Sequence, residues 1–231
     1  MPTRNVRRAS AVIASLAAGA LAMACAAGSD GAKDARGAPP SGSPSQADGR
    51  EDRVAGRAIH SVLPGVDLSR RTVPLTDLVS GGVGADSGIP SLHHPQFDSI
   101  ERASDWLTPR EPVVALEVNG EARIYPIQIV MWHEVVNDVL GGDPVLVTFC
   151  PLCYTAIAFD RRVGGEVRDF GVSGLLRESD LILYDYQTTT LWQQLTGDAV
   201  VGTDAGERLR FLPAQLVAFA DARAQYPDAL V

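Results

Sequence analysis

Alternation of apolar and polar residues around tight-turn dipeptides is the feature that most restricts the fold of this chain. The segment "VVALEVNGEARIYP", residues 113–126, alternates on both sides of Asn119-Gly120. Alternation places successive side chains on opposite faces of a strand, and Asn-Gly favours the two-residue turn of a β-hairpin. Further glycine-containing hairpins are predicted around 141–142, 164–165 and within 199–212. We therefore expect an α+β fold, one domain dominated by antiparallel β-sheet with a few peripheral helices.

Two segments have the spacing of such peripheral helices. In "FDSIERASDWL", residues 97–107, apolar side chains recur at a helical interval, and Asp98 or Ser99 can cap the first turn. In "PAQLVAFADARAQYP", residues 213–227, one proline stands in the first turn and another at the end. Both segments are predicted to be helical.

A charge-free apolar run near the N-terminus predicts export. Three arginines, Arg4, Arg7 and Arg8, precede "ASAVIASLAAGALAMA". This run has about the length of a signal-peptide core and is short for a membrane span. Residues 1–24 are therefore predicted to be a signal peptide, and the rest of the chain is expected outside the cytoplasm.

The residues after this run predict a lipid anchor. "LAMAC" resembles the bacterial lipobox, which would make Cys25 the lipidated first residue of a mature membrane-anchored lipoprotein. The same residues contain an A-x-A site for ordinary signal peptidase, so secretion of the chain is the alternative. Residues 25–56 are rich in Gly, Ser, Ala and Pro, which predicts a flexible linker. Residues 57–231 would then form one globular domain.

The net charge bears on the partners of the domain. The formal net charge is −8 at pH 7. Such a charge argues against binding to nucleic acid and against adsorption to anionic lipid. The lipid on Cys25 is the predicted contact with the membrane, and the composition identifies no small-molecule or protein partner.

Two of the three cysteines of the chain form a Cys-x-x-Cys pair, Cys150 and Cys153, in "TFCPLCYTAIAFD". The residues after Cys153 alternate, so the pair lies between two predicted strands. In thioredoxin-like proteins such a pair opens a helix, whose dipole lowers the pKa of the first thiol. A turn between strands is closer to the knuckle of a rubredoxin or zinc ribbon. Those sites take four ligands, and the chain has no second Cys-x-x-Cys.

A hairpin at Gly141-Gly142 would bring a histidine to this pair. A symmetric loop there places Val136 opposite Val147 and His133 opposite Cys150. Directly opposite residues have Cβ atoms about 4.5 to 5.5 Å apart, close enough to share a metal ion or a proton. The alternative is that "PIQIVMWHEVV" forms a helix beginning at Pro126.

Three long motifs resemble a known family. "YPIQIVMWHEVVND", "VTFCPLCYTAIAFDR" and "FGVSGLLRESDLILYDYQTTTLWQQLTG" are similar to the bacterial and archaeal domain-of-unknown-function family DUF3179, and the similarity runs from about residue 60 to the C-terminus. The resemblance implies an exported or anchored domain and assigns no activity. Tyr154 stands where the pattern of the family has glycine, which predicts a difference in the turn after Cys153.

A polar and aromatic stretch between residues 173 and 192 is a second candidate site. It contains Ser173, Arg177, Asp180, Tyr184, Asp185, Gln187 and Trp192. These residues either belong to turns and strand edges or line a cleft, with Tyr184 and Trp192 as stacking surfaces. No Ser-His-Asp arrangement or phosphate-binding loop is evident, so whether the chain is an enzyme stays open.

Three functions are compatible with the sequence. The favoured hypothesis is a soft-metal site for copper or zinc formed by Cys150, Cys153 and His133. The second is thiol–disulfide redox chemistry with the two cysteines as catalytic residues. The third is a non-catalytic binding lipoprotein in which a Cys150–Cys153 disulfide is structural, as is common for exported thiols.

Overall fold

The computed structural model describes residues 46–85 and 87–231. The predicted signal peptide, Cys25 and most of the predicted linker lie outside the described residues. The C-terminal end of that linker, from residue 46, is helical instead, because it belongs to α1 (Gln46–Val62). Ile59 of this helix is fully buried, so α1 is part of the folded domain. No helix in the described part of the chain is both long and apolar enough to cross a membrane.

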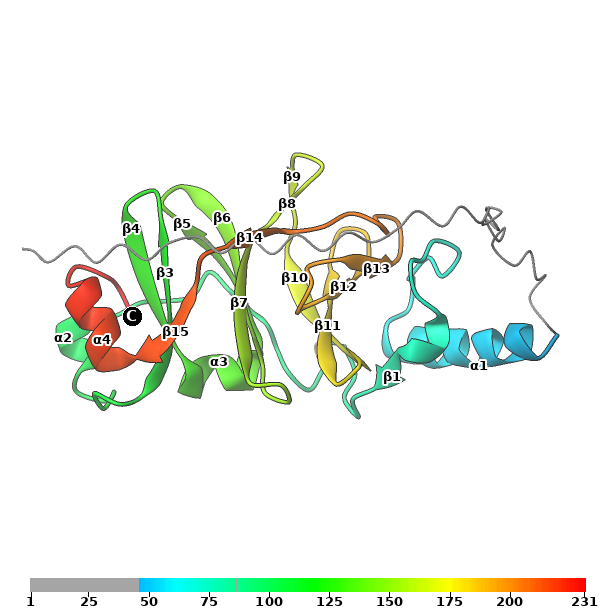
Figure 1. Cartoon of the computed structure of the whole chain (residues 1–231), viewed down its shortest axis with the longest axis horizontal. Coiled ribbons are helices and arrows are strands. Elements are labelled where there is room, and N and C mark those ends of the chain that lie inside the picture. The colour runs from blue at the N-terminus through cyan, green and yellow to red at the C-terminus, as the bar shows by residue number, and fades with distance from the viewer. Residues whose placement is uncertain (1–45, 86) are drawn as a thin grey trace, which may run out of the picture. The chain divides into compact units, whose positions relative to one another are not determined.

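The strands form three main sheets and one small hairpin (Figure 1). The first sheet has the order β1 (Val79–Ser80), β10 (Phe170–Arg177), β11 (Asp180–Asp185), β12 (Leu191–Gln193), β13 (Ala199–Val201). The second has the order β14 (Arg210–Leu212), β7 (Thr155–Asp160), β6 (Asp143–Cys150), β5 (Val135–Leu140), β2 (Leu92–His93). The third has the order β15 (Gln215–Ala218), β3 (Pro112–Val118), β4 (Glu121–Pro126), and β8 (Arg162–Val163) pairs with β9 (Glu166–Val167).

The predicted α+β fold dominated by antiparallel sheet is confirmed. All pairs of neighbouring strands described are antiparallel except β2–β5, which is parallel. The remaining helical elements are short: η1 (Leu75–Asp77), α2 (Ile100–Ala103), α3 (Ile127–His133) and α4 (Phe219–Gln225).

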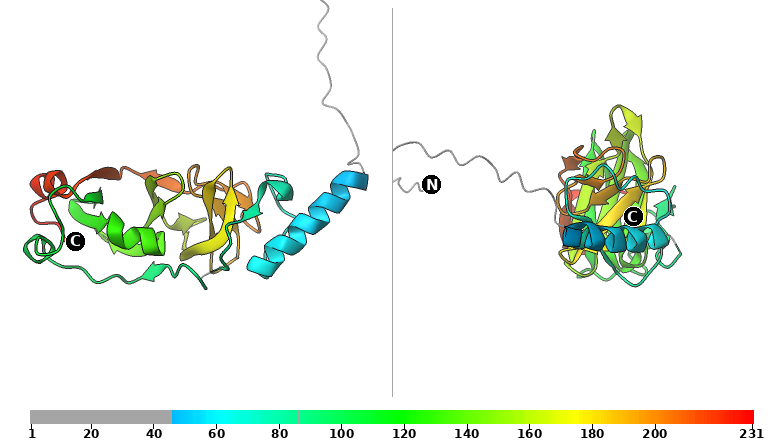
Figure 2. Two further views of the ribbon diagram at one scale, coloured as in Figure 1. Left: turned by 90° about the horizontal axis from the view of Figure 1, so that it is seen from below. Right: turned by 90° about the vertical axis from the view of Figure 1, so that its right-hand side faces the viewer.

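Four apolar clusters hold these elements in layers (Figures 1 and 2). One cluster, with Ile59 and Tyr184, packs α1 on the first sheet. A second, with Cys150 and Trp192, lies between the first and second sheets. A third, with Phe149, packs the second sheet against the third sheet and α3, and a fourth packs α2 and α4 on the far face of the third sheet. The cysteine pair therefore lies at the contact between the first two sheets.

Three of the four predicted hairpins are present. Val118 pairs with Glu121 around Asn119-Gly120, and Val136 pairs with Val147 around Gly141-Gly142 as predicted. Val163 pairs with Glu166 around the third glycine pair. The segment 199–212 also reverses, with an antiparallel bridge between Asp198 and Arg208 and a hydrogen bond of 2.9 Å from the Ala199 amide to the Glu207 carbonyl oxygen, but it does not form the strand pair of the predicted hairpin. Its two arms belong to different sheets, because β13 pairs with β12 and β14 pairs with β7.

The two predicted helices are each shorter than their sequence patterns. Ser99 caps α2 by accepting a hydrogen bond from the Arg102 amide, as expected, but α2 has only four residues. The first half of segment 213–227 is the strand β15, which pairs with β3, and α4 begins only at Phe219. Pairing with the open edge of the third sheet overrides the helical pattern there, since tertiary context outweighs intrinsic propensity.

Candidate metal centre

The Cys-x-x-Cys pair forms a turn between two strands, as predicted. Cys150 is the last residue of β6 and pairs with Thr155, the first residue of β7. The thiol of Cys150 is buried in the cluster between the first and second sheets, and Cys153 packs against it from a half-buried position. Both thiols are free, so no disulfide joins them.

A buried carboxylate from the first sheet completes the group. Asp180 is the first residue of β11 and is 0% exposed. The Cys153 thiol donates to Asp180 Oδ1 across 3.7 Å, and the Leu195 amide donates to Oδ2 across 3.0 Å. The two sulfurs and a carboxylate oxygen all lie within 4.8 Å of one another, which is a spacing that could hold a metal ion.

A buried hydrogen-bond network holds the turn that carries the thiols. The hydroxyl of Thr155 lies 3.3 Å from Cys153 Sγ and donates to Gln194 Oε1 across 3.2 Å. Gln194 Nε2 in turn donates to Thr148 Oγ1 across 3.0 Å, and both of these side chains are fully buried. Satisfied polar networks of this kind rigidify their surroundings, so the thiols lie on a fixed frame.

Burial shifts the protonation of two members of the group. The pKa of the Cys150 thiol is raised to about 11, first by burial and then by the hydrogen bond with Cys153. Burial also raises the pKa of Asp180, against the hydrogen bond from the Leu195 amide, which lowers it. Cys150 is thus protonated at neutral pH and is a weak nucleophile, because the thiolate is the reactive form.

His133 does not lie opposite Cys150, which corrects the predicted pairing. The alternative helix is present as α3, with Pro126 at its N-cap and His133 as its last residue. Glu134 then adopts a left-handed conformation with φ of 57°, and strand β5 begins only at Val135. The hairpin register therefore ends before it reaches His133. The imidazole Nδ1–H instead donates to the Pro90 carbonyl oxygen across 2.7 Å, and the donor group contains Asp180 rather than His133.

Most residues of the second candidate site serve the packing of the first sheet. Trp192 Nε1–H donates to Asp185 Oδ2 across 3.0 Å, and Asp185 also accepts a hydrogen bond from the Thr188 amide. Tyr184 is buried against the α1 layer, and the buried Ser173 hydroxyl donates to the Ile182 carbonyl oxygen. The structure thus distributes these residues among separate surroundings.

The other members of that set have distinct positions. Arg177 donates to Gln193 Oε1 across 2.8 Å and forms an ion pair with Asp77. Gln187 is exposed and accepts a hydrogen bond from the Asp169 amide. Of the residues in this second candidate site, only Asp180 belongs to the donor group with the two thiols. The sequence carries no local signal for that contact, because Asp180 is 27 residues from Cys153 and meets it across two sheets.

Tyr154 stands at the position where the sequence pattern of the similar family has glycine. Its φ of 50° lies in the left-handed region, which glycine adopts without steric cost. The tyrosine ring lies edge-on to the Phe149 ring, with 5.3 Å between the centroids. This contact between the rings offsets part of the backbone strain. The turn after Cys153 therefore keeps a glycine-like backbone with an aromatic side chain in place.

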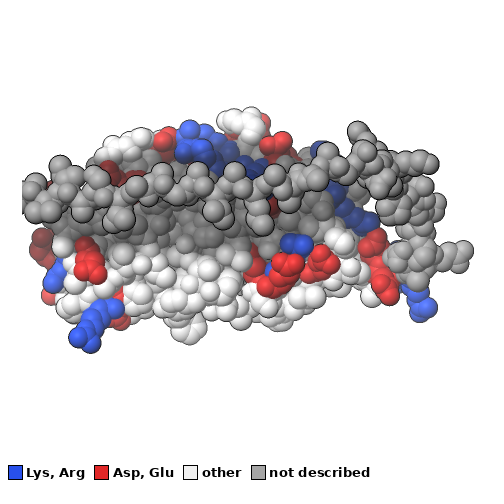
Figure 3. Space-filling view, in the orientation of Figure 1, with Lys and Arg blue, Asp and Glu red and all other residues white. Residues whose placement is uncertain are grey.

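The surface around the thiols is largely uncharged. Leu152 and Tyr154 of the turn are more than half exposed, and Trp132 of α3 is 73% exposed. Figure 1 places α3 and the turn between β6 and β7 at the lower edge of the view, and the same edge in Figure 3 shows few charged side chains. Such a surface contributes little to drawing charged molecules toward the thiols.

Burial of Glu134, in the connection between α3 and β5, predicts that the stability of the domain depends on pH. Glu134 is 9% exposed, and burial raises its pKa from 4.5 to about 7. The folded state therefore binds a proton more tightly than the unfolded state, so stability should fall as the pH rises from about 4.5 to about 7. Glu134→Gln should remove this loss and be more stable than the parent at pH 8 by up to about 3 kcal/mol.

The measurement is urea unfolding of parent and variant between pH 4 and pH 8. An exposed carboxylate offers the control, because Glu207→Gln should leave the pH dependence unchanged. Parallel stability curves for the parent and Glu134→Gln would show that burial of this carboxylate is not costly.

Comparison with known proteins identifies a family over most of the chain. The family model described as "Protein of unknown function (DUF3179)" matches residues 86–231. Neither a search of curated proteins nor a search of solved structures found a match. The matched region includes both cysteines, Asp180 and the whole hydrogen-bond network around them.

Proposed function

The chain belongs to the DUF3179 family of unknown function, and we propose that it is a metal-binding domain in which Cys150, Cys153 and Asp180 hold one Zn²⁺ ion. The observation that carries this proposal is the convergence of two sulfurs and one carboxylate oxygen, all within 4.8 Å of one another, at the contact of two sheets.

The spacing of the donor atoms suits a tetrahedral ion. With Zn–S of about 2.3 Å and Zn–O of about 2.1 Å, ligand sulfur and oxygen atoms lie about 3.6 Å apart. The distance from Cys153 Sγ to Asp180 Oδ1 is 3.7 Å. Binding would therefore need little movement of these two side chains. The buried network around Thr155 and Gln194 would hold them in the same place before and after binding.

The ligand set favours zinc over copper. Zn²⁺ accepts thiolate, imidazole and carboxylate ligands, whereas Cu(I) prefers soft sulfur ligands and a carboxylate is a hard donor. Three protein ligands leave a fourth position for water or another molecule, which is the arrangement of open zinc sites. Cys153 is the half-buried ligand, so this position would lie on the solvent side of the group.

We also propose that this domain acts outside the cytoplasm. The support is the basic, apolar and small-residue order of the N-terminal sequence, with Cys25 at the lipobox-like position. A lipid on Cys25 would hold the domain at the outer face of the cell membrane, and cleavage at the A-x-A site would release it.

One observation favours thiol–disulfide exchange as a second function. The two thiols are close and unbonded, and the Asp180 carboxylate can accept the proton of Cys153. Oxidation would join the two sulfurs, while two electrons and two protons would pass to a partner disulfide. Against this function, no helix begins at Cys150 to lower the pKa of its thiol.

Metal titration of the reduced protein tests the proposal. We expect one Zn²⁺ per chain, and Co²⁺ in the same site should give the strong visible absorption of a tetrahedral thiolate complex. Protein whose thiols have been alkylated is the control and should bind neither ion. Failure of the reduced protein to bind Zn²⁺ or Co²⁺ would overturn the proposal, and a disulfide that then equilibrates with thiol reagents would support redox chemistry.

A further inference from the structure

A cavity lies away from the thiols, between α3 and the strand β4. Its volume is about 220 Å³. Apolar side chains of Leu92, Phe97, Ile129 and Val130 form much of its wall, and His133 is among the residues that line it. Neither cysteine nor Asp180 lines this cavity.

The aromatic wall of the cavity is held in place by contacts outside it. The Phe97 ring lies edge-on to the Tyr125 ring at 6.0 Å, and the Arg123 guanidinium lies over Phe97 at 4.1 Å. The Tyr125 hydroxyl donates to Asp138 Oδ2 across 2.9 Å, and Asp138 also pairs with Arg123. These contacts fix both rings, so the cavity is preformed and the Tyr125 hydroxyl is committed elsewhere.

His133 lines the cavity and has one ring nitrogen that can accept a hydrogen bond. Because a carbonyl oxygen only accepts, the bond to Pro90 places the proton on Nδ1. In the neutral imidazole, Nε2 is then an acceptor, and no hydrogen bond to it is seen among the described residues. Gln96, which is exposed, is the other lining residue with a polar side chain that could bind a ligand, and most of the remaining lining residues are apolar. This lining favours a largely apolar ligand that carries a hydrogen-bond donor.

The volume limits the size of that ligand. A cavity of about 150 Å³ binds benzene, and pockets for drug-sized molecules begin at about 300 Å³. The present cavity, at about 220 Å³, lies between these sizes. We propose that it is a binding site for a monocyclic molecule with a single hydroxyl group, whose ring packs against Phe97 and Tyr125 and whose hydroxyl donates to His133 Nε2.

Binding of phenol and toluene to the full-length protein tests this proposal. The two molecules have the same shape, but only phenol has a hydroxyl donor. We expect both to bind with dissociation constants of about 1 mM or tighter, measured by calorimetry or by ligand-detected NMR. The ratio of phenol affinity to toluene affinity should be roughly five- to tenfold lower in His133→Phe than in the parent, because the acceptor is lost.

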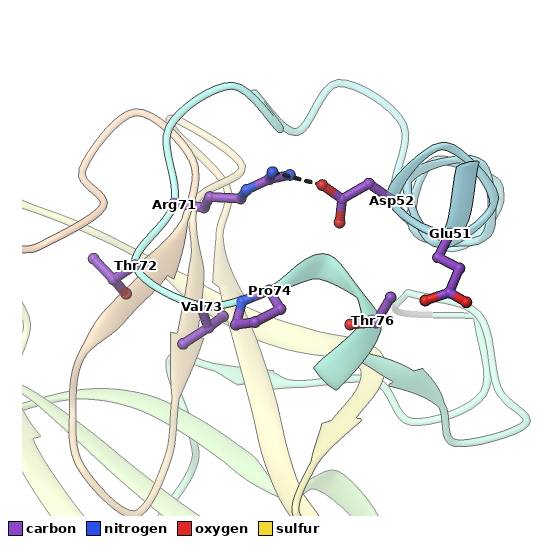
Figure 4. Close-up of a pocket in the computed structure, with 7 residues that line it drawn as sticks. All are labelled: Glu51, Asp52, Arg71, Thr72, Val73, Pro74 and Thr76. Carbon is purple, nitrogen blue, oxygen red and sulfur yellow. Dashed lines mark hydrogen bonds and ion pairs between the residues drawn. The ribbon is translucent and has the colours of Figure 1, made fainter. Parts of the chain in front are cut away.

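A pair of tryptophan substitutions locates the binding. Ile129→Trp fills the mouth of the cavity and should abolish binding of both molecules. The control is Thr76→Trp, an exposed position in another cavity, of about 500 Å³, beside the Arg71–Asp52 ion pair (Figure 4). This substitution should leave both dissociation constants unchanged. Unfolding curves of each variant check that the fold is retained.

Three results would overturn the proposal. They are the absence of binding of both molecules to the parent, unchanged binding in Ile129→Trp, and a phenol-to-toluene ratio that His133→Phe does not alter. None of the three proposed zinc ligands lines this cavity, so the metal proposal is tested separately.

Discussion

Zn²⁺ binding should weaken by about a hundredfold or more in each of three variants, Asp180→Asn, Cys150→Ser and Cys153→Ser. The variant His133→Ala should bind Zn²⁺ as tightly as the parent. Zinc-finger sites, which have four protein ligands, bind with about 10 to 16 kcal/mol, so a single protein ligand contributes on the order of 3 kcal/mol. A loss of that size corresponds to about two orders of magnitude in affinity. Competition with a chelator of known affinity measures it.

Asp180→Asn is the most informative of these variants. It keeps the size of the side chain, and its amide oxygen can still accept the hydrogen bond from the Leu195 amide. Asn is neutral at every pH and is a poor ligand for zinc, so the site loses a charge while the packing is retained. Urea unfolding without metal should show that the fold survives.

His133→Ala is the matched control, because His133 was the ligand that the sequence predicted. Its imidazole is bonded to Pro90 and lies outside the donor group. A loss of zinc affinity in His133→Ala equal to that in Cys150→Ser, together with normal affinity in Asp180→Asn, would restore the histidine as the third ligand and refute the present assignment.

Gly141→Ala should destabilise the domain by about 3 kcal/mol or more, against about 1 kcal/mol for Gly142→Ala. Both glycines have positive φ, 57° and 81°, in the turn between β5 and β6. A Cβ on Gly141 would lie 2.2 Å from the Val118 carbonyl oxygen, whereas a Cβ on Gly142 meets nothing within 4 Å. The two substitutions share the left-handed strain and differ in the backbone clash.

The clash at Gly141 cannot be relieved by a side-chain rotation, because the obstructing atom belongs to the backbone. Asn119 and Glu121 bind the backbone of Gly141 through hydrogen bonds of 2.9 and 3.1 Å, so the two hairpin turns would have to separate. Urea unfolding of the two variants and the parent gives both free energies. Equal losses for the two variants would show that the turns separate easily.

Short-range features of the fold were predictable from the sequence. The turn at Asn119-Gly120, the register of Val136 with Val147 and the strand–turn–strand geometry of Cys150 and Cys153 all agree with the structure. Each depends on residues close together in the chain. Glycine determines where the chain reverses, and the two-residue alternation determines which faces are buried, so local chemistry is sufficient.

The ligand set and the ends of several elements were decided only by tertiary structure. His133 leaves the predicted register because Glu134 takes a left-handed conformation, and segment 215–218 is a strand because the edge of the third sheet pairs with it. Asp180 reaches Cys153 only because the first sheet packs on the second. Burial of apolar surface between sheets determines which distant strands meet. Because this burial is non-directional, no local sequence pattern reveals which strands it brings together. The third donor atom therefore follows from the packing of the sheets, and the cysteine pair from the local sequence.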